Sequence, residues 1–192
     1  MAASTGTLGS WSARRIVGNM FPLLVALSVI VLWAGITLED AEELLGEYGA
    51  LAVMVPVMVG MGGNLGAILS SRLTTRLHLG TTEFDPRDRH LWATVTAILA
   101  LAATVFATLA VVVWLVGLYT GSGLPLSTLL FISLSSGLSV AVIAVCFAVA
   151  ATYGSYRLGI DPDDTTIPIV TNVVDVFGML IFLGIARWTL GG

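Results

Sequence analysis

Near the C-terminal end of the sequence lies an apolar run of membrane-spanning length, PIVTNVVDVFGMLIFLGIA at residues 168–186, which contains a single carboxylate. An acid at bilayer depth is costly unless it faces the interior of a helix bundle or a water-filled path, so Asp175 is the first candidate for a functional residue. Helical spacing places Thr171 and Asn172 one turn before it and Gly178 one turn after it. This narrow polar and small stripe predicts that the helix lines a site or a path.

The composition is that of an integral membrane protein. Hydrophobic residues make up 57% of the 192 residues and charged residues only 10%, which argues against a soluble enzyme. Membrane spans of about 20 residues leave room for about five or six helices with short loops. We therefore expect an all-α integral membrane domain over residues 14–192, preceded by a short tail at residues 1–13.

Five apolar segments are predicted to cross the membrane, at residues 16–37, 48–69, 91–119, 126–153 and 168–186. The last of these helices is expected to start at Pro168, where a proline in the first turn is tolerated. Residues 70–90 are polar and basic, and they predict an interfacial loop. The connector after the first span carries Glu39, Asp40, Glu42, Glu43 and Glu47. We interpret it as a solvated loop, with a cation-concentrating pore mouth as the alternative.

The second span contains Pro56 and then the glycine-rich sequence GMGGNLG at residues 60–66. Proline removes a helical donor and glycines loosen the backbone, so freed carbonyl groups could line a cavity. The alternative is close helix packing through small residues four apart, such as Gly62 and Gly66. Both interpretations can hold together. A nucleotide-binding loop is excluded, because the stretch lacks the strand-then-helix setting of such motifs.

Other polar and reactive residues are predicted to be structural. The fourth span carries a small-residue face suited to close helix contact, consisting of Ser133, Ser135, Ser136, Gly137 and Ser139. The single cysteine, Cys146, is interpreted as a small packing residue, and His78 and His90 lack the spacing of metal ligands. One buried acid offers neither an acid/base pair nor a nucleophile/base pair, so the sequence does not predict an enzyme.

The arginines indicate the orientation of the chain in the cell membrane. With five spans and a cytoplasmic N-terminus, only Arg187 falls outside, and the inner side carries Arg14, Arg15, Arg72, Arg76, Arg87, Arg89 and Arg157. A bias of this kind over short loops predicts that the N-terminus is inside and the C-terminus outside.

Two motifs resemble a known family. GALAVMVPVMVGMGGNLG at residues 49–66, followed by SRLTTR at residues 71–76, resembles the second transmembrane helix of MgtE magnesium channels and of the related solute carrier family 41. LGIDP at residues 158–162 and the run from Pro168 to Arg187 look like the last helix of that family and the loop before it. The resemblance covers almost the whole chain and implies an MgtE-like membrane domain.

The sequence departs from the MgtE pattern in three places. Gly66-Ala67-Ile68-Leu69 replaces the usual Gly-Asn-Gln-Ser and is nearer to the solute carrier 41 pattern, and Ile167 replaces a polar residue before Pro168. The large N-terminal cytosolic domains of MgtE have no counterpart, so the chain resembles the membrane module alone.

The resemblance implies a symmetric dimer in which Asp175 from both subunits holds a largely hydrated Mg²⁺ ion, the transported substrate, in a central pore. The pore-lining residues that it implies are Thr171, Asn172, Asn64, Gly62, Gly63 and Gly178. The expected partners are an identical chain or a close homologue, the lipid bilayer and a separate cytosolic regulatory subunit, with no nucleic acid. Mg²⁺ sheds its water reluctantly and prefers a few carboxylates with retained water, which agrees with a single acid in each chain.

Two functional hypotheses follow. The first is a divalent cation channel or transporter, with passive conduction and sodium-coupled exchange both open. The alternative is a non-transporting membrane scaffold or regulatory subunit. The intact Asp175, Asn64 and glycine run argue against a degenerate copy and favour transport.

Overall fold

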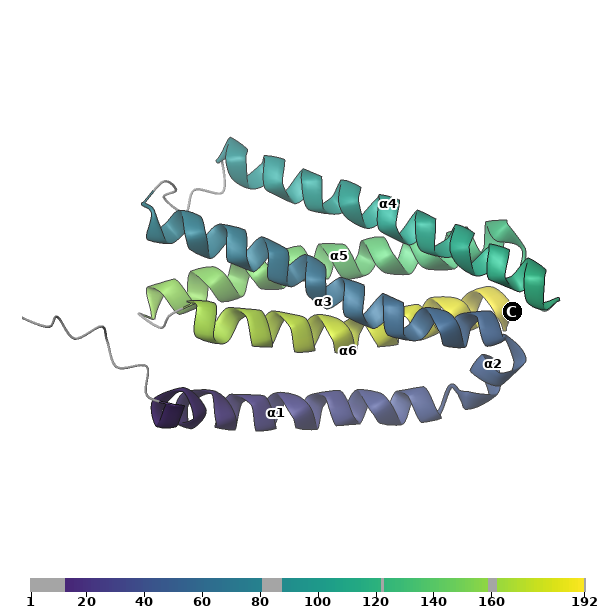
Figure 1. Cartoon of the computed structure of the whole chain (residues 1–192), viewed down its shortest axis with the longest axis horizontal. Coiled ribbons are helices and arrows are strands. Elements are labelled where there is room, and N and C mark those ends of the chain that lie inside the picture. Colours follow the sequence, from purple (N-terminus) through teal and green to yellow (C-terminus); the bar gives the residue numbers. More distant parts are fainter. Residues whose placement is uncertain (1–12, 81–87, 122, 159–161, 192) are drawn as a thin grey trace, which may run out of the picture.

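The computed structural model describes residues 13–80, 88–121, 123–158 and 162–191, and these residues are almost entirely helical (Figure 1). The long helices are α1 (Ala13–Glu39), α3 (Gly49–His78), α4 (Arg89–Thr120), α5 (Leu126–Arg157) and α6 (Pro162–Leu190), and a short helix α2 (Glu42–Glu47) joins α1 to α3. Over the described residues, five helices are long and apolar enough to cross a membrane. The predicted all-α fold with five spans is confirmed, and the protein is a multi-pass membrane protein.

Three helices form the centre of the bundle. α3 packs on α5 and α6, and α5 also packs on α6. α4 lies mainly against α5 and to a lesser extent against α3, whereas α1 lies against α6 (Figure 1). Asp175 lies on α6, so the candidate site is carried by one of the three central helices.

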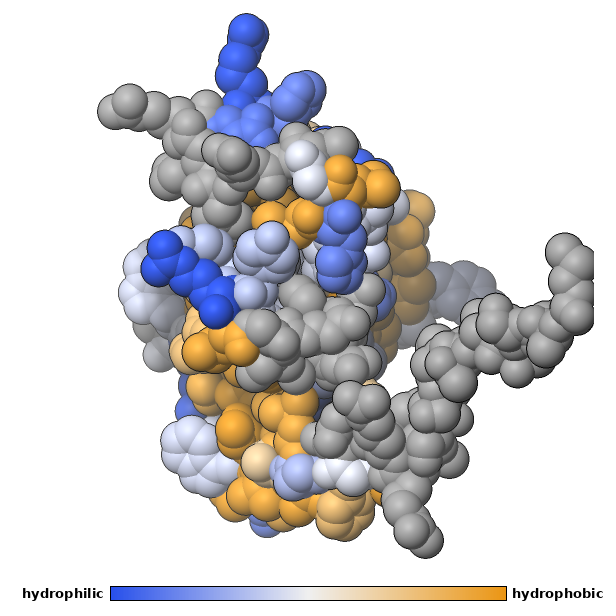
Figure 2. Space-filling view, turned by 90° about the vertical axis from the view of Figure 1, so that its left-hand side faces the viewer, coloured by the Kyte–Doolittle hydropathy of each residue, from blue (hydrophilic) through white to orange (hydrophobic). Residues whose placement is uncertain are grey.

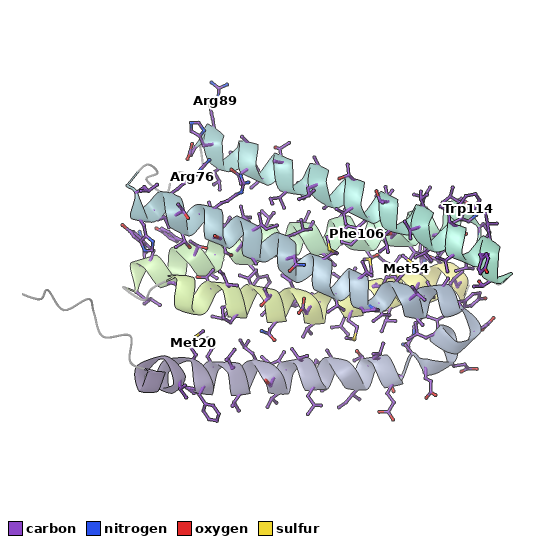
Figure 3. The ribbon with its side chains drawn as sticks, viewed as in Figure 1. Met20, Met54, Arg76, Arg89, Phe106 and Trp114 are labelled. Atoms are coloured by element: carbon purple, nitrogen blue, oxygen red, sulfur yellow. The ribbon has the colours of Figure 1, made fainter. Side chains whose placement is uncertain are left out.

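Successive long helices run in opposite directions, so Arg76 and Arg89 lie at the same end of the bundle (Figure 3). Figure 2 looks onto this end, where hydrophilic side chains project beyond an apolar body. Arg187 lies in the last turn of α6, which points to the opposite end. Among the described residues, Arg72, Arg76, Arg89 and Arg157 lie at one end and Arg187 at the other, as expected, whereas Arg87 lies outside the described residues. The orientation in the membrane stays a prediction.

The boundary predicted after the second span is wrong, because α3 continues to His78. In its last turns Leu73, Thr74 and Leu77 are buried, whereas Arg72 and Thr75 are exposed. This one-sided pattern of burial is that of an amphipathic helix that still packs on the bundle after its outer face has become polar. Residues 70–78 are therefore part of the packed helix, and a loop is excluded for them.

The acidic connector, predicted to be a solvated loop, contains a short helix. Residues 42–47 form α2, with Glu42 and Glu43 in its first turn, where acidic side chains interact favourably with the helix dipole. Leu44 and Leu45 pack against the buried core, to which Ala41 belongs. The two leucines hold the connector against the end of the bundle.

The last helix begins at Pro162, six residues before the predicted start. A proline is tolerated in the first turn of a helix, where its missing N–H would have no partner in any case. Pro168 therefore lies inside α6, one turn before Thr171 and Asn172.

The predicted small-residue face of α5 is confirmed in part, since Ser139 is exposed and Ser135 only half-buried. Ser133, Ser136 and Gly137 are buried, and the hydroxyl of Ser133 donates a hydrogen bond of 2.7 Å to the carbonyl oxygen of Phe106. A Cβ atom at Gly137 would lie 2.2 Å from two carbon atoms of the Phe106 ring, which is buried in the core. The absence of a side chain at Gly137 thus provides the space for this ring.

The interpretation of Cys146 as a small packing residue is wrong, because the residue is exposed. The buried side of α5 is occupied here by Ala144 and Ala148, and a position midway between them points away from the core. Apolar neighbours in the sequence do not show whether a residue of a membrane helix faces the core of the bundle or its outside.

We expect Gly137→Ala to destabilise the protein by about 1–3 kcal/mol, because the added methyl group forces the buried Phe106 ring to move. Gly154→Ala on the same helix is the matched control, since a Cβ atom there meets nothing within 4 Å among the described residues. The free energies of unfolding of both variants in mixed micelles provide the test. Equal values for the two variants would contradict the packing described here.

Candidate ion site around Asp175

Asp175 lies near the middle of the apolar part of α6 (Thr166–Leu190) and is half-buried. Its Oδ1 atom is buried and accepts no hydrogen bond from any described residue. Ser70 Oγ and Thr152 Oγ1 share this property, but they belong to neutral hydroxyl groups. A buried carboxylate oxygen without a partner is far more costly than a hydroxyl, so Asp175 is the position that a cation would stabilise most.

Gly63 of α3 faces the carboxylate. A Cβ atom at this glycine would lie 2.7 Å from Asp175 Oδ1 and 3.5 Å from Thr171 Cβ. The first distance is shorter than a side chain tolerates, so only glycine allows the α3 backbone to approach the acid this closely. The structure thus brings together three of the predicted site residues, Asp175, Gly63 and Thr171.

The neighbouring glycines form a close-packed contact between α3 and the two other central helices. A Cβ atom at Gly62 would lie 2.6 Å from Val140 Cγ1 of α5 and 3.0 Å from Val174 Cγ1 of α6. A Cβ atom at Gly66 would lie 2.5 Å from Val170 Cγ1. The packing interpretation of the glycine run is therefore confirmed, and α3 passes through Pro56 and these glycines as one uninterrupted helix.

Thr171 and Asn172 turn their side chains back onto α6. The Thr171 hydroxyl donates to the carbonyl oxygens of Ile167 at 2.9 Å and Pro168 at 3.2 Å, and the Asn172 side-chain amide donates to the latter at 2.8 Å. Side chains of these types commonly satisfy backbone carbonyl groups in this way. Each keeps an oxygen that can accept a further hydrogen bond, one turn from Asp175.

The remaining predicted pore residues occupy two kinds of surroundings. Asn64 is exposed and follows directly after Gly63. Gly178 is buried, and a Cβ atom there would lie 3.6 Å from Val140 Cγ1 and 3.9 Å from the carbonyl oxygen of Met58. Gly62 and Gly178 thus lie in the packed interior of one chain, and a pore-lining role stays a prediction for all the residues named.

Asp175 does not belong to a cluster of three metal-binding side chains, because among the described residues no three His, Cys, Asp or Glu side chains are grouped so that they could hold a metal ion. A single carboxylate beside hydroxyl and amide oxygens does not suit a dehydrated ion, but it suits a divalent cation that retains most of its water.

One contact was missed by the sequence analysis. The guanidinium Nη2 of Arg187, near the end of α6, donates a hydrogen bond of 2.6 Å to the carbonyl oxygen of Asp40, directly after α1. It connects the last helix to the acidic connector. The two residues are too far apart in sequence for spacing to indicate a contact.

The chain matches known transport proteins over most of its length. The family model MgtE, described as a divalent cation transporter, matches residues 55–185. The magnesium transporter MgtE of Thermus thermophilus is 32% identical over 188 residues, which cover 98% of this chain and 39% of that protein. Solute carrier family 41 member 3 of Mus musculus is 28% identical over 189 residues, which cover 90% of this chain and 38% of that protein.

The five long apolar helices define a multi-pass membrane protein, and its sequence matches a family described as divalent cation transporters. The chain belongs to the MgtE family, which confirms the resemblance read from the two motifs. It spans less than half of the length of the curated relatives it matches.

Gly66→Ala should lower the free energy of unfolding by about 1–3 kcal/mol, because its methyl group would overlap Val170 Cγ1. Shortening Val170 removes this overlap. Val170→Ala should therefore lower the free energy of unfolding less in the Gly66→Ala background than in the parent. A double-mutant cycle measured by unfolding in mixed micelles gives this coupling. Additive effects would show that the two positions do not touch.

Proposed function

We propose that this chain transports divalent cations, Mg²⁺ in the first place, across the cell membrane, and that Asp175 is the ion ligand. The observation that carries the proposal is the buried, unpartnered Oδ1 atom of Asp175, held against the backbone of Gly63 on a membrane-spanning helix. It is supported by membership of the MgtE family and by similarity to a protein named a magnesium transporter.

The chemistry follows from the cost of removing water from a small dication. The carboxylate charge of Asp175 offsets partial desolvation of the ion at bilayer depth, while most of its water is retained. The side-chain oxygens of Thr171 and Asn172, together with Asn64, are suited to accept hydrogen bonds from that water. In this mechanism the site selects by charge and by the geometry of a hydrated ion.

The ion path is completed by a second chain in this proposal. One chain supplies one carboxylate, and Asp175 is only half-buried while Asn64 is exposed, so this side of the bundle is open. A two-fold axis next to α3 and α6 would place two Asp175 residues around one path, with an identical chain or a close homologue as the partner. In this proposal the N-terminus lies inside the cell and the C-terminus outside. The end of the bundle that carries Arg76 and Arg89 then faces the cytosol, where a regulatory subunit could bind it.

Asp175→Asn should reduce Mg²⁺ flux at least about tenfold, a factor that corresponds to about 1.4 kcal/mol, because the amide keeps the shape and removes the charge. Flux into liposomes with a Mg²⁺-sensitive dye inside measures the effect at equal protein content. Glu43→Gln in α2 is the control, since it removes one negative charge outside the long helices. Parent-like flux through Asp175→Asn would refute the assignment of Asp175.

The open side of the bundle also predicts where two chains meet. In a Cys146→Ser background, Asn64→Cys should be joined into covalent dimers by a short bis-maleimide, because Asn64 is exposed beside Gly63 on the proposed interface. The parent chain, whose only cysteine is Cys146 on α5, is the control and should stay uncrosslinked. Particle mass in nanodiscs is measured in parallel, and monomers that still transport Mg²⁺ would overturn the dimer.

A further inference from the structure

Two buried hydroxyl groups of the central helices have no hydrogen-bond partner among the described residues. They are Ser70 Oγ on α3 and Thr152 Oγ1 on α5, and both residues are fully buried. Hydroxyl groups within helices commonly donate to the backbone of the preceding turn, as that of Thr94 does to the carbonyl oxygen of His90 at 2.9 Å. Ser70 and Thr152 make no such bond. Since a buried hydroxyl without a partner is costly, each of the two still needs one.

The contacts between α3 and α6 follow a regular register. A Cβ atom at Gly62 would lie 3.0 Å from Val174 Cγ1, and one at Gly66 would lie 2.5 Å from Val170 Cγ1. Four residues forward on α3 thus correspond to four residues back on α6, because the two helices run in opposite directions (Figure 1). Continued by one turn, this register leads toward the end of the bundle that carries Arg76 (Figure 3).

The next step of the register places Ser70 opposite Thr166. Both residues are fully buried, in agreement with continued contact between the helices. The Thr166 hydroxyl donates to Ser155 Oγ of α5 at 3.4 Å, which is long for a hydrogen bond between two hydroxyl groups. Ser155 follows Thr152 by three residues and so lies on the same face of α5. Hydroxyl groups from α3, α5 and α6 are therefore gathered at this end of the bundle.

A neutral ligand suits these groups better than an ion. Ser70 and Thr152 each have a hydroxyl proton to donate, which a water molecule can accept and a cation cannot. A buried cation without a paired negative charge would also be costly. Buried water typically makes about three hydrogen bonds to polar groups that would otherwise lack partners. We propose that the hydroxyl groups of Ser70, Thr152 and Thr166 hold buried water between α3, α5 and α6.

The proposed hydration site involves none of the residues assigned to the ion path, so it stands whether or not Asp175 binds an ion. Ser155, which is half-buried, lies between the site and the surroundings of the protein. Water can therefore enter from this side without crossing the close contact between the glycines of α3 and the valines of α6.

Two alanine methyl groups of α5 allow a direct test. A Cβ atom at Gly66 would lie 3.6 Å from Ala144 Cβ, and α3 and α5 run in the same direction, so Ala148 reaches the level of Ser70. Both alanines are fully buried. In the full chain in nanodiscs, magnetisation transfer from water to labelled alanine methyl groups should be several-fold faster at Ala148 than at Ala144. Equal transfer at the two positions would overturn the proposal.

Thr152→Val provides a second test, because it removes the hydroxyl and keeps the shape of the side chain. Loss of a hydrogen bond to water should raise the unfolding equilibrium constant about five-fold, the factor that corresponds to about 1 kcal/mol. A dry, unpartnered hydroxyl would have the opposite effect, and valine would then stabilise the protein. Thr108→Val on α4 is the control, since the exposed Thr108 hydroxyl donates to the carbonyl oxygen of Thr104 at 2.8 Å.

The control variant should stay within about two-fold of the parent, as expected for an exposed position. A Thr152→Val variant that equals the parent or is more stable would overturn the proposal. Stabilisation of the parent by Na⁺ at constant ionic strength, lost in Thr152→Val, would identify a cation and overturn it as well. The measurement on the alanine methyl groups uses the parent chain, so it decides the question even where a variant fails to fold.

Discussion

The approach of the α3 backbone to Asp175 is the constraint on which the rest of the structure depends. A Cβ atom at Gly63 would lie 2.7 Å from the carboxylate oxygen, so α3 and α6 can be this close only where α3 has no side chain. The glycines on either side extend the contact to Val170, Val174 and Val140. In lipid no hydrophobic force drives helices together, so such close contact is what holds them. A carboxyl group at bilayer depth is thereby held by close packing between α3 and α6.

The polar side chains near the acid bind to the backbone of their own helix. Thr171 and Asn172 donate to carbonyl oxygens of the preceding turn of α6. Asp175, one turn further, receives no such hydrogen bond on Oδ1 from the described residues. The donors of Thr171 and Asn172 are thus used within the helix, whereas this oxygen of Asp175 has no partner among the described residues.

The sequence predicted the spans well because hydrophobic length is a property of each segment alone. It also predicted the packing at Gly62 and Gly66, since small residues four apart indicate close helix contact. It failed where tertiary contact overrides local polarity. α3 continues past Ser70 because one face remains buried, and α2 forms because Leu44 and Leu45 reach the core. The hydrogen bond from Arg187 to Asp40 and the outward position of Cys146 depend on how helices are arranged, which spacing along one helix does not reveal.

The attachment of α1 has a consequence for the order of assembly. α1 packs chiefly on α6 and is joined to it by the hydrogen bond from Arg187 to the Asp40 carbonyl. Because α1 precedes α6 in the sequence, it is synthesised before the helix that is its main neighbour. Until then its apolar surface, including Phe21 and Trp33, is in contact with lipid or with the insertion machinery. α3, α4 and α5 contact one another without α6, whereas α1 needs α6 for its main contact.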